Sequence, residues 1–256
     1  MSKIINIMTW NVDWFRNGKR TGKPKEYFER DSSKEIYNPI INKIKNYLEN
    51  ENAIVFLQEV PYRVKSNRWH QHFLYDQLIK DFPLDEYDVF VNKSVNNGFF
   101  YRCTIAIAAK DNFSLLQSNY LRNNRTIAVQ AHNCIFIGVH MPTQFTKEDE
   151  NCEIWNNIIE FIKTNGQTSN IVLAGDFNTY IGCQDKLTEE KYLELLNYMG
   201  NCVSESIITF GKTSIDKFLI SKNNIRNINH YVIQVQHDCE ENLSDHKYIC
   251  MEISVE

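Results

Sequence analysis

Proline and glycine are scarce in this chain, with 5 prolines and 9 glycines among 256 residues. They are spread along the sequence, and no Pro-, Gly- or Ser-rich stretch divides it. We therefore predict one domain spanning residues 1–256, without internal repeats or low-complexity segments. A hydrophobic content of 43% over this length is enough to bury a large core.

Long apolar runs are also missing. The opening residues 1–8 are too short and too interrupted for a signal peptide, and no apolar run approaches the length of a membrane span. These absences predict a soluble, cytoplasmic protein without a membrane partner, and we expect it to be a monomer.

Paired cysteine motifs are absent as well. The seven cysteines form no Cys-x-x-Cys pair, and Cys103, Cys134 and Cys250 sit inside apolar segments. This pattern favours buried thiols in a reducing compartment over disulfides or zinc ligands. The net charge of −4 argues against a protein that coats nucleic acid by bulk attraction, but it allows a local basic rim.

Several nucleotide and nucleophile motifs do not occur. The chain has no Gly-x-x-x-x-Gly-Lys, no Gly-x-Ser-x-Gly and no dinucleotide-binding fingerprint. Kinase, serine-hydrolase and dehydrogenase functions are correspondingly disfavoured.

One buried strand ends in polar residues and is the most informative stretch present. Residues 171–175 are apolar or small, and Asp176 and Asn178 follow directly. A carboxylate and an amide two residues apart can address one water or one hard metal ion together. On its own the pair is explained equally well by an ordinary Asp-x-Asn turn.

The same arrangement recurs along the chain. Asn11 and Asp13 follow the predicted strand 4–11, and His140 ends strand 135–140, although a lone histidine there would be unremarkable. Predicted strand ends carry the following polar residues: Asn11, Glu59, His140, Asp176, Asn178, Asp216, Asp245 and His246. Because each is attached to an element with a fixed apolar pattern, we expect a rigid site.

Apolar periodicity predicts the remaining elements. Helices are expected at residues 39–48, beginning at Asn38-Pro39, then at 69–82, at 146–163, and at 188–199, closed by Gly200. Strands are expected at the following residues: 53–57, 87–91, 99–109, 113–116, 126–131, 213–221, 231–235 and the C-terminal segment. The successive runs between residues 87 and 140 suggest antiparallel hairpins.

Carboxylates gathered in this way predict a divalent cation, because neighbouring acids repel unless a cation lies among them. Glu59 with Asn11 or Asp245 supplies the oxygen ligands that Mg²⁺ prefers. If Asp216 accepts a hydrogen bond from His246, the charged ring is favoured and can contact a phosphate oxygen. Asp176 and Asn178 can then hold a water for attack on phosphorus, which predicts a phosphoester hydrolase without a covalent nucleophile.

The order of these motifs resembles the endonuclease/exonuclease/phosphatase superfamily, which includes DNase I, abasic endonucleases, neutral sphingomyelinases and inositol polyphosphate 5-phosphatases. The resemblance covers nearly the whole chain through these short strings: Trp10-Asn11, Gln58-Glu59, Val139-His140-Met141-Pro142, Gly175-Asp176-Phe177-Asn178, Ser214-Ile215-Asp216 and Ser244-Asp245-His246. The string Thr9-Trp10-Asn11-Val12-Asp13 looks like the tyrosyl-DNA phosphodiesterase branch.

The resemblance implies an α/β fold, a four-layer sandwich of two mixed β-sheets flanked by helices (DNase I-like). It also implies a Mg²⁺ site, with Mn²⁺ as a substitute, at Asn11, Glu59 and Asp245. Asp176 and Asn178 would position the attacking water, and Asp216 would orient His246 toward the scissile phosphate. His140 looks like the histidine near the leaving group, where exonuclease III-type members usually have a tyrosine.

Three functions follow as hypotheses. The first is a nuclease acting on DNA, held by a basic rim made of these residues: Arg16, Lys19, Arg20, Arg63 and Arg102. The second is a phosphatase or phosphodiesterase of the same superfamily acting on an inositol phosphate or sphingomyelin type of substrate. The third is a catalytically silent binding protein, which is disfavoured because every matched position has a competent side chain.

Overall fold

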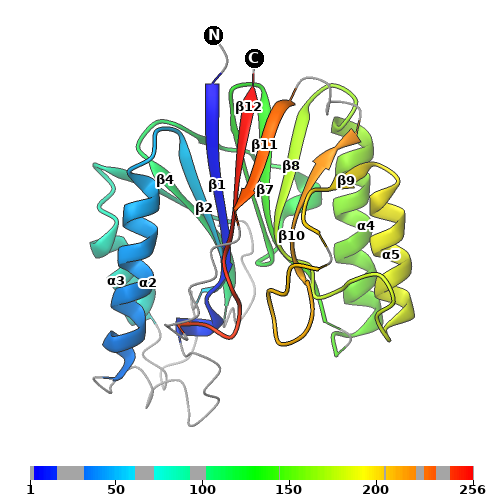
Figure 1. The fold of residues 1–256 in the computed structure, drawn as a ribbon, viewed down its shortest axis with the longest axis horizontal. Coiled ribbons are helices and arrows are strands. Elements are labelled where there is room, and N and C mark those ends of the chain that lie inside the picture. Colours follow the sequence, from blue (N-terminus) through cyan, green and yellow to red (C-terminus); the bar gives the residue numbers. More distant parts are fainter. Residues whose placement is uncertain are drawn as a thin grey trace.

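Two β-sheets packed face to face, with helices outside each, make up the computed structural model (Figure 1). The structure describes these residues: 3–15, 32–60, 72–92, 102–143, 145–204, 206–222, 228–234 and 243–255. Helices α2 and α3 cover the outer face of one sheet, and α4 and α5 cover the other (Figure 1). The expected four-layer α/β sandwich is therefore confirmed.

The first sheet has six strands in the order β11-β12-β1-β2-β4-β3. Their bounds are as follows: β1 Lys3–Asn11, β2 Ala53–Val60, β3 Tyr87–Val91, β4 Cys103–Ala109, β11 Ile228–Gln234 and β12 Ile249–Val255. β1 and β2 are parallel and the other neighbours are antiparallel, so this sheet is mixed.

The second sheet has six strands in the order β5-β6-β7-β8-β10-β9. Their bounds are as follows: β5 Ser114–Leu115, β6 Thr126–Ala131, β7 Cys134–His140, β8 Asn170–Asp176, β9 Met199–Asn201 and β10 Asp216–Ser221. Only β7 and β8 are parallel.

The chain changes sheet between β4 and β5. The expected series of hairpins from residue 87 to residue 140 is therefore interrupted there, because β4 pairs with β2 and β3 whereas β5 pairs with β6. Alternating apolar residues specify a strand and its two faces, but they do not specify which strand becomes its neighbour.

Three apolar layers account for strands that are buried on both faces. In β2, Val55 and Leu57 pack toward α2 and α3, whereas Ile54 and Phe56 pack into the layer between the sheets. The third layer joins the second sheet to α4 and α5 and includes Trp155. Because consecutive residues of a strand enter different layers, a continuous apolar run is needed in place of a simple alternation.

The helical segments differ from the expected ones mainly at their ends. Their bounds are as follows: η1 Asp13–Phe15, α2 Ser32–Leu48, α3 His72–Asp81, η2 Asn119–Leu121, α4 Glu148–Asn165 and α5 Lys186–Leu196. The predicted start at Asn38-Pro39 is wrong, because Pro39 lies inside α2. The turn before it is held by the Tyr37 hydroxyl, which donates to Asp81 Oδ2 over 2.8 Å, so the loss of one backbone hydrogen bond at proline is tolerated.

Two other predicted helix ends are also corrected. α4 begins after Lys147, which has no side-chain cap hydrogen bond, and not at residue 146 as expected. α5 begins after Asp185, whose carboxylate accepts from the Thr188 amide, and it ends at Leu196; Gly200 lies in β9. Pairing of β9 with β10 takes this glycine into the sheet.

Among the described residues, six cysteines are free, and Cys103, Cys134 and Cys250 are buried, as expected. Burial raises the pKa of the Cys134 thiol to about 11. In the part of the chain that the structure describes, no helix is long and apolar enough to cross a membrane.

Candidate active site

The carboxyl ends of β1, β2, β7 and β8 meet at one end of the sandwich, the lower end in Figure 1. A close approach of β8 to β7 sets the register there. Gly175 has a φ of 151°, and a Cβ at this position would lie 1.9 Å from the Val139 carbonyl oxygen. Glycine therefore allows the pairing that places Asp176 opposite His140.

Asp176 is buried and both of its carboxylate oxygens are engaged. Asn11 Nδ2 donates to Oδ2 over 3.0 Å, and the Asn178 amide donates to Oδ1 over 2.8 Å. Asn178 adopts a positive φ of 50° and donates its Nδ2 to the Met141 carbonyl over 2.8 Å. Burial raises the pKa of Asp176 to about 7, against the opposing charge of His246, so this carboxylate is more basic than an ordinary aspartate.

His246 is held between two aspartates. Its Nδ1 lies 3.0 Å from Asp216 Oδ2, and its Nε2 lies 3.8 Å from Asp176 Oδ2. Burial alone would lower the pKa of His246, but the charges of the two aspartates outweigh it and raise that pKa to about 10. The imidazole is therefore positively charged at neutral pH. The Phe210 ring lies beside it, with ring centroids 4.5 Å apart.

The segment that carries Asp245 and His246 is bound to β1. Trp10 Nε1 donates to the His246 carbonyl over 3.1 Å, and the Ser244 hydroxyl donates to the Asn11 carbonyl over 2.6 Å. Asp245 and His246 precede β12 by a few residues, so they lie in a loop fixed by these contacts and not in the strand itself.

Glu59 lies at the end of β2 with a positive φ of 59°, which is unusual for a glutamate and indicates local constraint. Its Oε2 is 2.6 Å from Arg102 Nη1, and its Oε1 is 3.5 Å from His140 Nε2. Burial would raise the pKa of Glu59, but His140, Arg102 and a hydrogen bond from Asn11 together lower it. Glu59 is therefore an anion.

His140 is the opposite of His246. Burial lowers its pKa to about 3, and the positive charges of Arg125 and Arg102 act in the same direction, whereas Glu59 opposes them. The ring is therefore neutral, and as a neutral ring it has one N–H to donate. The Arg125 guanidinium donates to the His140 carbonyl over 3.4 Å, which helps to fix the end of β7.

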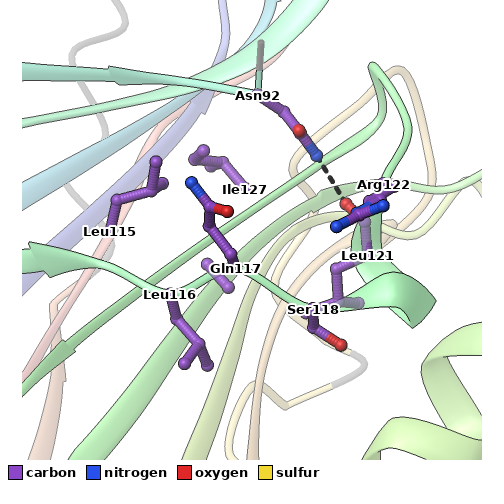
Figure 2. A pocket seen from close by; sticks show the side chains of 9 residues that line it. Asn92, Leu115, Leu116, Gln117, Ser118, Leu121, Arg122 and Ile127 are labelled. Atoms are coloured by element: carbon purple, nitrogen blue, oxygen red, sulfur yellow. Dashed lines mark hydrogen bonds between the residues drawn. The ribbon is translucent and has the colours of Figure 1, made fainter. Parts of the chain in front are cut away.

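Several of these groups line one cavity of about 720 Å³, and Asn11, His140 and Asp216 lie behind them. Five carboxylates line it: Asp13, Glu59, Asp176, Asp185 and Asp245. Asn178 and His246 line it too, as do Arg102, Phe145 and Phe210. A second cavity of about 400 Å³ is different in kind, because its described lining includes three leucines, Ile127 and Ala128, and Arg122 is the charged residue among them (Figure 2).

The chemistry of the acidic cavity fits a divalent metal ion. Burial, together with the carboxylates of Asp13 and Glu59, raises the pKa of Asp245, although the charge of His246 opposes this shift. Carboxylates that destabilise one another in this way are stabilised by a cation placed among them.

A second group of ligand-type side chains lies close by, since Asp176, Asp216 and His246 bring their ligand atoms within 4.8 Å of one another. In this second group Asp216 is fully buried and already contacts His246 Nδ1, whereas Asp245 is exposed and lines the cavity.

All eight polar residues singled out at strand ends reach this site, and Arg102 joins them. The other four residues of the expected basic rim lie outside the described residues: Arg16, Lys19, Arg20 and Arg63. Asp13 was noted after the first strand but was not assigned to the site, although it follows Asn11 by two residues as Asn178 follows Asp176. Sequence reasoning also missed Phe145, Asp185 and Phe210 as parts of the cavity.

Known structures share this fold. No family model and no curated protein matches the chain. An endonuclease/exonuclease/phosphatase from Bacteroides vulgatus is 16% identical, with a TM-score of 0.64 and coverage of 99% of this chain and 100% of that one. Truncated TDP2 from Caenorhabditis elegans is 14% identical, with a TM-score of 0.60 and coverage of 98% and 97%.

A variant of the 3′ phosphatase NExo from Neisseria, bound to a product DNA hairpin, is 15% identical. Its TM-score is 0.59, and the match covers 97% of this chain and 99% of that one. The chain therefore has the DNase I-like fold of the endonuclease/exonuclease/phosphatase superfamily, as its motifs predict.

Proposed function

We propose that this chain is a Mg²⁺-dependent phosphodiesterase, and specifically a nuclease that hydrolyses DNA by in-line attack of an activated water. The observation that carries the proposal is the meeting of Glu59, Asp176 and His246 in one cavity, with Asp216 behind His246. Glu59 lies more than a hundred positions before Asp176, and His246 lies 70 positions after Asp176, so their convergence is a property of the fold.

Asp176 is the proposed base for the attacking water. Both of its oxygens accept hydrogen bonds from amides, which orients the carboxylate, and its raised pKa of about 7 makes it basic enough to take a proton near neutral pH. The side-chain amide of Asn178 is fixed by the hydrogen bond from its Nδ2 to the Met141 carbonyl, and it can hold the same water.

His246 and His140 have different proposed roles because their charges differ. The charged His246 stabilises negative charge on the phosphoryl oxygens, and Asp216 keeps its ring oriented. The neutral His140 lies beside Glu59, and we assign it a role near the leaving group because its motif resembles that of superfamily members with a histidine there.

Glu59 and Asp245 are the proposed ligands of the ion, with Asn11 and Asp13 beside them. Asn11 Nδ2 donates to Asp176, and its Oδ1 accepts from the Asp13 amide over 3.0 Å, so this side chain also connects the water-activating and metal-binding halves. When bound, Mg²⁺ or Mn²⁺ neutralises charge developing on the phosphoryl group.

DNA is the proposed substrate because the structurally similar NExo is bound to a DNA product and because the sequence has basic segments near the ends of β1 and β2. The test is a panel of labelled plasmid DNA, single-stranded DNA, RNA, inositol phosphates and sphingomyelin, each with Mg²⁺, Mn²⁺ or EDTA. We expect DNA cleavage with Mg²⁺, and none in EDTA or after His246→Ala. Turnover of an inositol phosphate or sphingomyelin without any nucleic-acid cleavage would overturn the nuclease assignment.

Metal binding is tested separately from turnover. Glu59→Gln removes a proposed ligand charge, and we expect it to weaken Mn²⁺ binding at least about tenfold in calorimetry. Glu160→Gln is the matched control, because Glu160 is exposed on α4 and pairs with Lys163. Equal Mn²⁺ affinity in both variants would contradict the assignment of Glu59 as a ligand.

A further inference from the structure

Arg102 is the one arginine or lysine among the described residues that line the acidic cavity, where it faces five carboxylates. Its Nη1 lies 2.6 Å from Glu59 Oε2, and its side chain remains 36% exposed. The Arg102 guanidinium thus contacts the carboxylate that we propose as a metal ligand, and the same side chain lines the cavity.

The position of Arg102 is set by its backbone. Its carbonyl accepts from Asn124 Nδ2 over 2.9 Å, and the next residue but one, Thr104, donates its amide to the Asn124 carbonyl over 2.8 Å. Arg102 immediately precedes β4, so these contacts extend the ordered structure of that strand to the residue that meets Glu59.

We propose that Arg102 has two opposing effects in this cavity: it weakens divalent-metal binding at Glu59, and it binds a non-bridging oxygen of the substrate phosphate. The proposal rests on the proposed function, because it assumes that a metal ion and a phosphate share this site.

The first effect follows from charge. A guanidinium in contact with Glu59 repels a divalent ion bound to the same carboxylate. The orientation of Glu59 does not depend on Arg102 alone, because Asn11 donates a hydrogen bond to it and His140 Nε2 lies 3.5 Å away. Removing the Arg102 side chain therefore removes its repulsion of the metal ion, while Asn11 still holds the Glu59 carboxylate.

The second effect concerns the binding of phosphate by the Arg102 guanidinium. A phosphate anion that enters a cavity with five acids meets strong repulsion, and a guanidinium offers N–H donors in a planar fork that matches phosphate oxygens. Glu59 contacts Nη1, which leaves donors on the other nitrogens for a ligand in the cavity.

The experiment compares Arg102→Met with Arg102→Lys, which keeps the charge, and with Arg122→Met as a matched control. Arg122 is exposed and lies at the leucine-lined cavity (Figure 2), so its loss removes an arginine without touching Glu59. Mn²⁺ binding is measured by electron paramagnetic resonance without substrate. KM and kcat are then measured for a labelled oligodeoxynucleotide at saturating Mn²⁺.

We expect Arg102→Met to bind Mn²⁺ about tenfold more tightly while its KM rises about tenfold, because removal of the charge acts on the two ligands in opposite directions. Arg102→Lys and Arg122→Met should bind Mn²⁺ like the wild type. Unchanged or weaker Mn²⁺ binding by Arg102→Met would overturn this inference and leave the proposed function standing. Failure of the wild type to bind Mn²⁺ would overturn both.

Discussion

Replacing Asp216 by Asn changes the charge beside His246 and little else. Asn is close in shape to Asp and keeps one acceptor oxygen, so a hydrogen bond to Nδ1 remains possible. The neighbouring contacts are also kept, because the Thr209 hydroxyl accepts from the backbone amide of residue 216 over 3.0 Å. The variant therefore tests whether the charge of Asp216 is what keeps the His246 ring protonated.

The size of the effect follows from the distances. At the 3.0 Å separation of Oδ2 and Nδ1, an ion pair with an effective dielectric constant near 20 contributes about 5.5 kcal/mol, equivalent to about 4 pKa units. Burial continues to favour the neutral ring, and Asp176 at 3.8 Å continues to favour the charged one. We expect the pKa of His246 to fall from about 10 to roughly 6.

The assay is a pH titration of the histidine ring carbons by NMR in EDTA, so that no metal contributes. The chain has 7 histidines, and the His246 signal is identified as the one missing from His246→Gln. Folding must be checked at each pH by circular dichroism, because the titration reports the Asp216–His246 interaction only while the protein is folded.

A His246 midpoint that stays above pH 9 in Asp216→Asn would refute the reasoning, since another group would then hold the proton. A midpoint near or below pH 6.5 in the wild type would refute it as well, because burial would then outweigh both aspartates.

Two further predictions concern stability. Gly175→Ala should lower the free energy of unfolding by at least about 3 kcal/mol in urea, because its Cβ would lie 1.9 Å from the Val139 carbonyl oxygen. Gly182→Ala should cost much less, since a Cβ there meets no atom within 4 Å; equal losses would contradict the close-approach explanation. For His140, whose pKa falls from 6.5 to about 3 on folding, the unfolded chain takes up more protons between these values. The free energy of unfolding should therefore decrease as pH falls below about 6.5, by up to about 1.4 kcal/mol per pH unit, and His140→Gln should reduce this slope in urea titrations.

Local pattern was enough to locate most of the elements. Apolar runs predicted strands such as residues 171–175, because a strand buried on both faces consists of apolar or small residues throughout. Helical periodicity identified the buried face of α4, including Ile154, Trp155 and Ile158. Helix ends were predicted less well. Pro39 and Gly200 were interpreted as boundaries, but tertiary contacts carried α2 past the proline and took the glycine into β9.

The candidate site was predictable in its membership because its residues follow strands in a recurring way. Asp13 was noted after the first strand, but nothing in the local pattern assigned it a role. Phe145 and Phe210 lie in connecting loops without periodicity. Sequence could not supply the pairing of Glu59 with Arg102, since the two residues are brought together only by β2 and β4 lying side by side.

The sequence by itself determined which side chains stand at the ends of rigid elements, because that depends on local pattern along the chain. Only the tertiary structure decided how they are charged. His140 and His246 are both buried histidines near carboxylates, yet one is neutral and the other positive. Burial lowers the pKa of both rings, and Asp176 lies 3.8 Å from His246 Nε2 and 3.9 Å from His140 Nε2. The difference arises because Asp216 contacts His246 Nδ1, whereas two arginines lie near His140 and oppose the charge of Glu59. A charge state depends on distances and burial in three dimensions, which no spacing along the chain specifies.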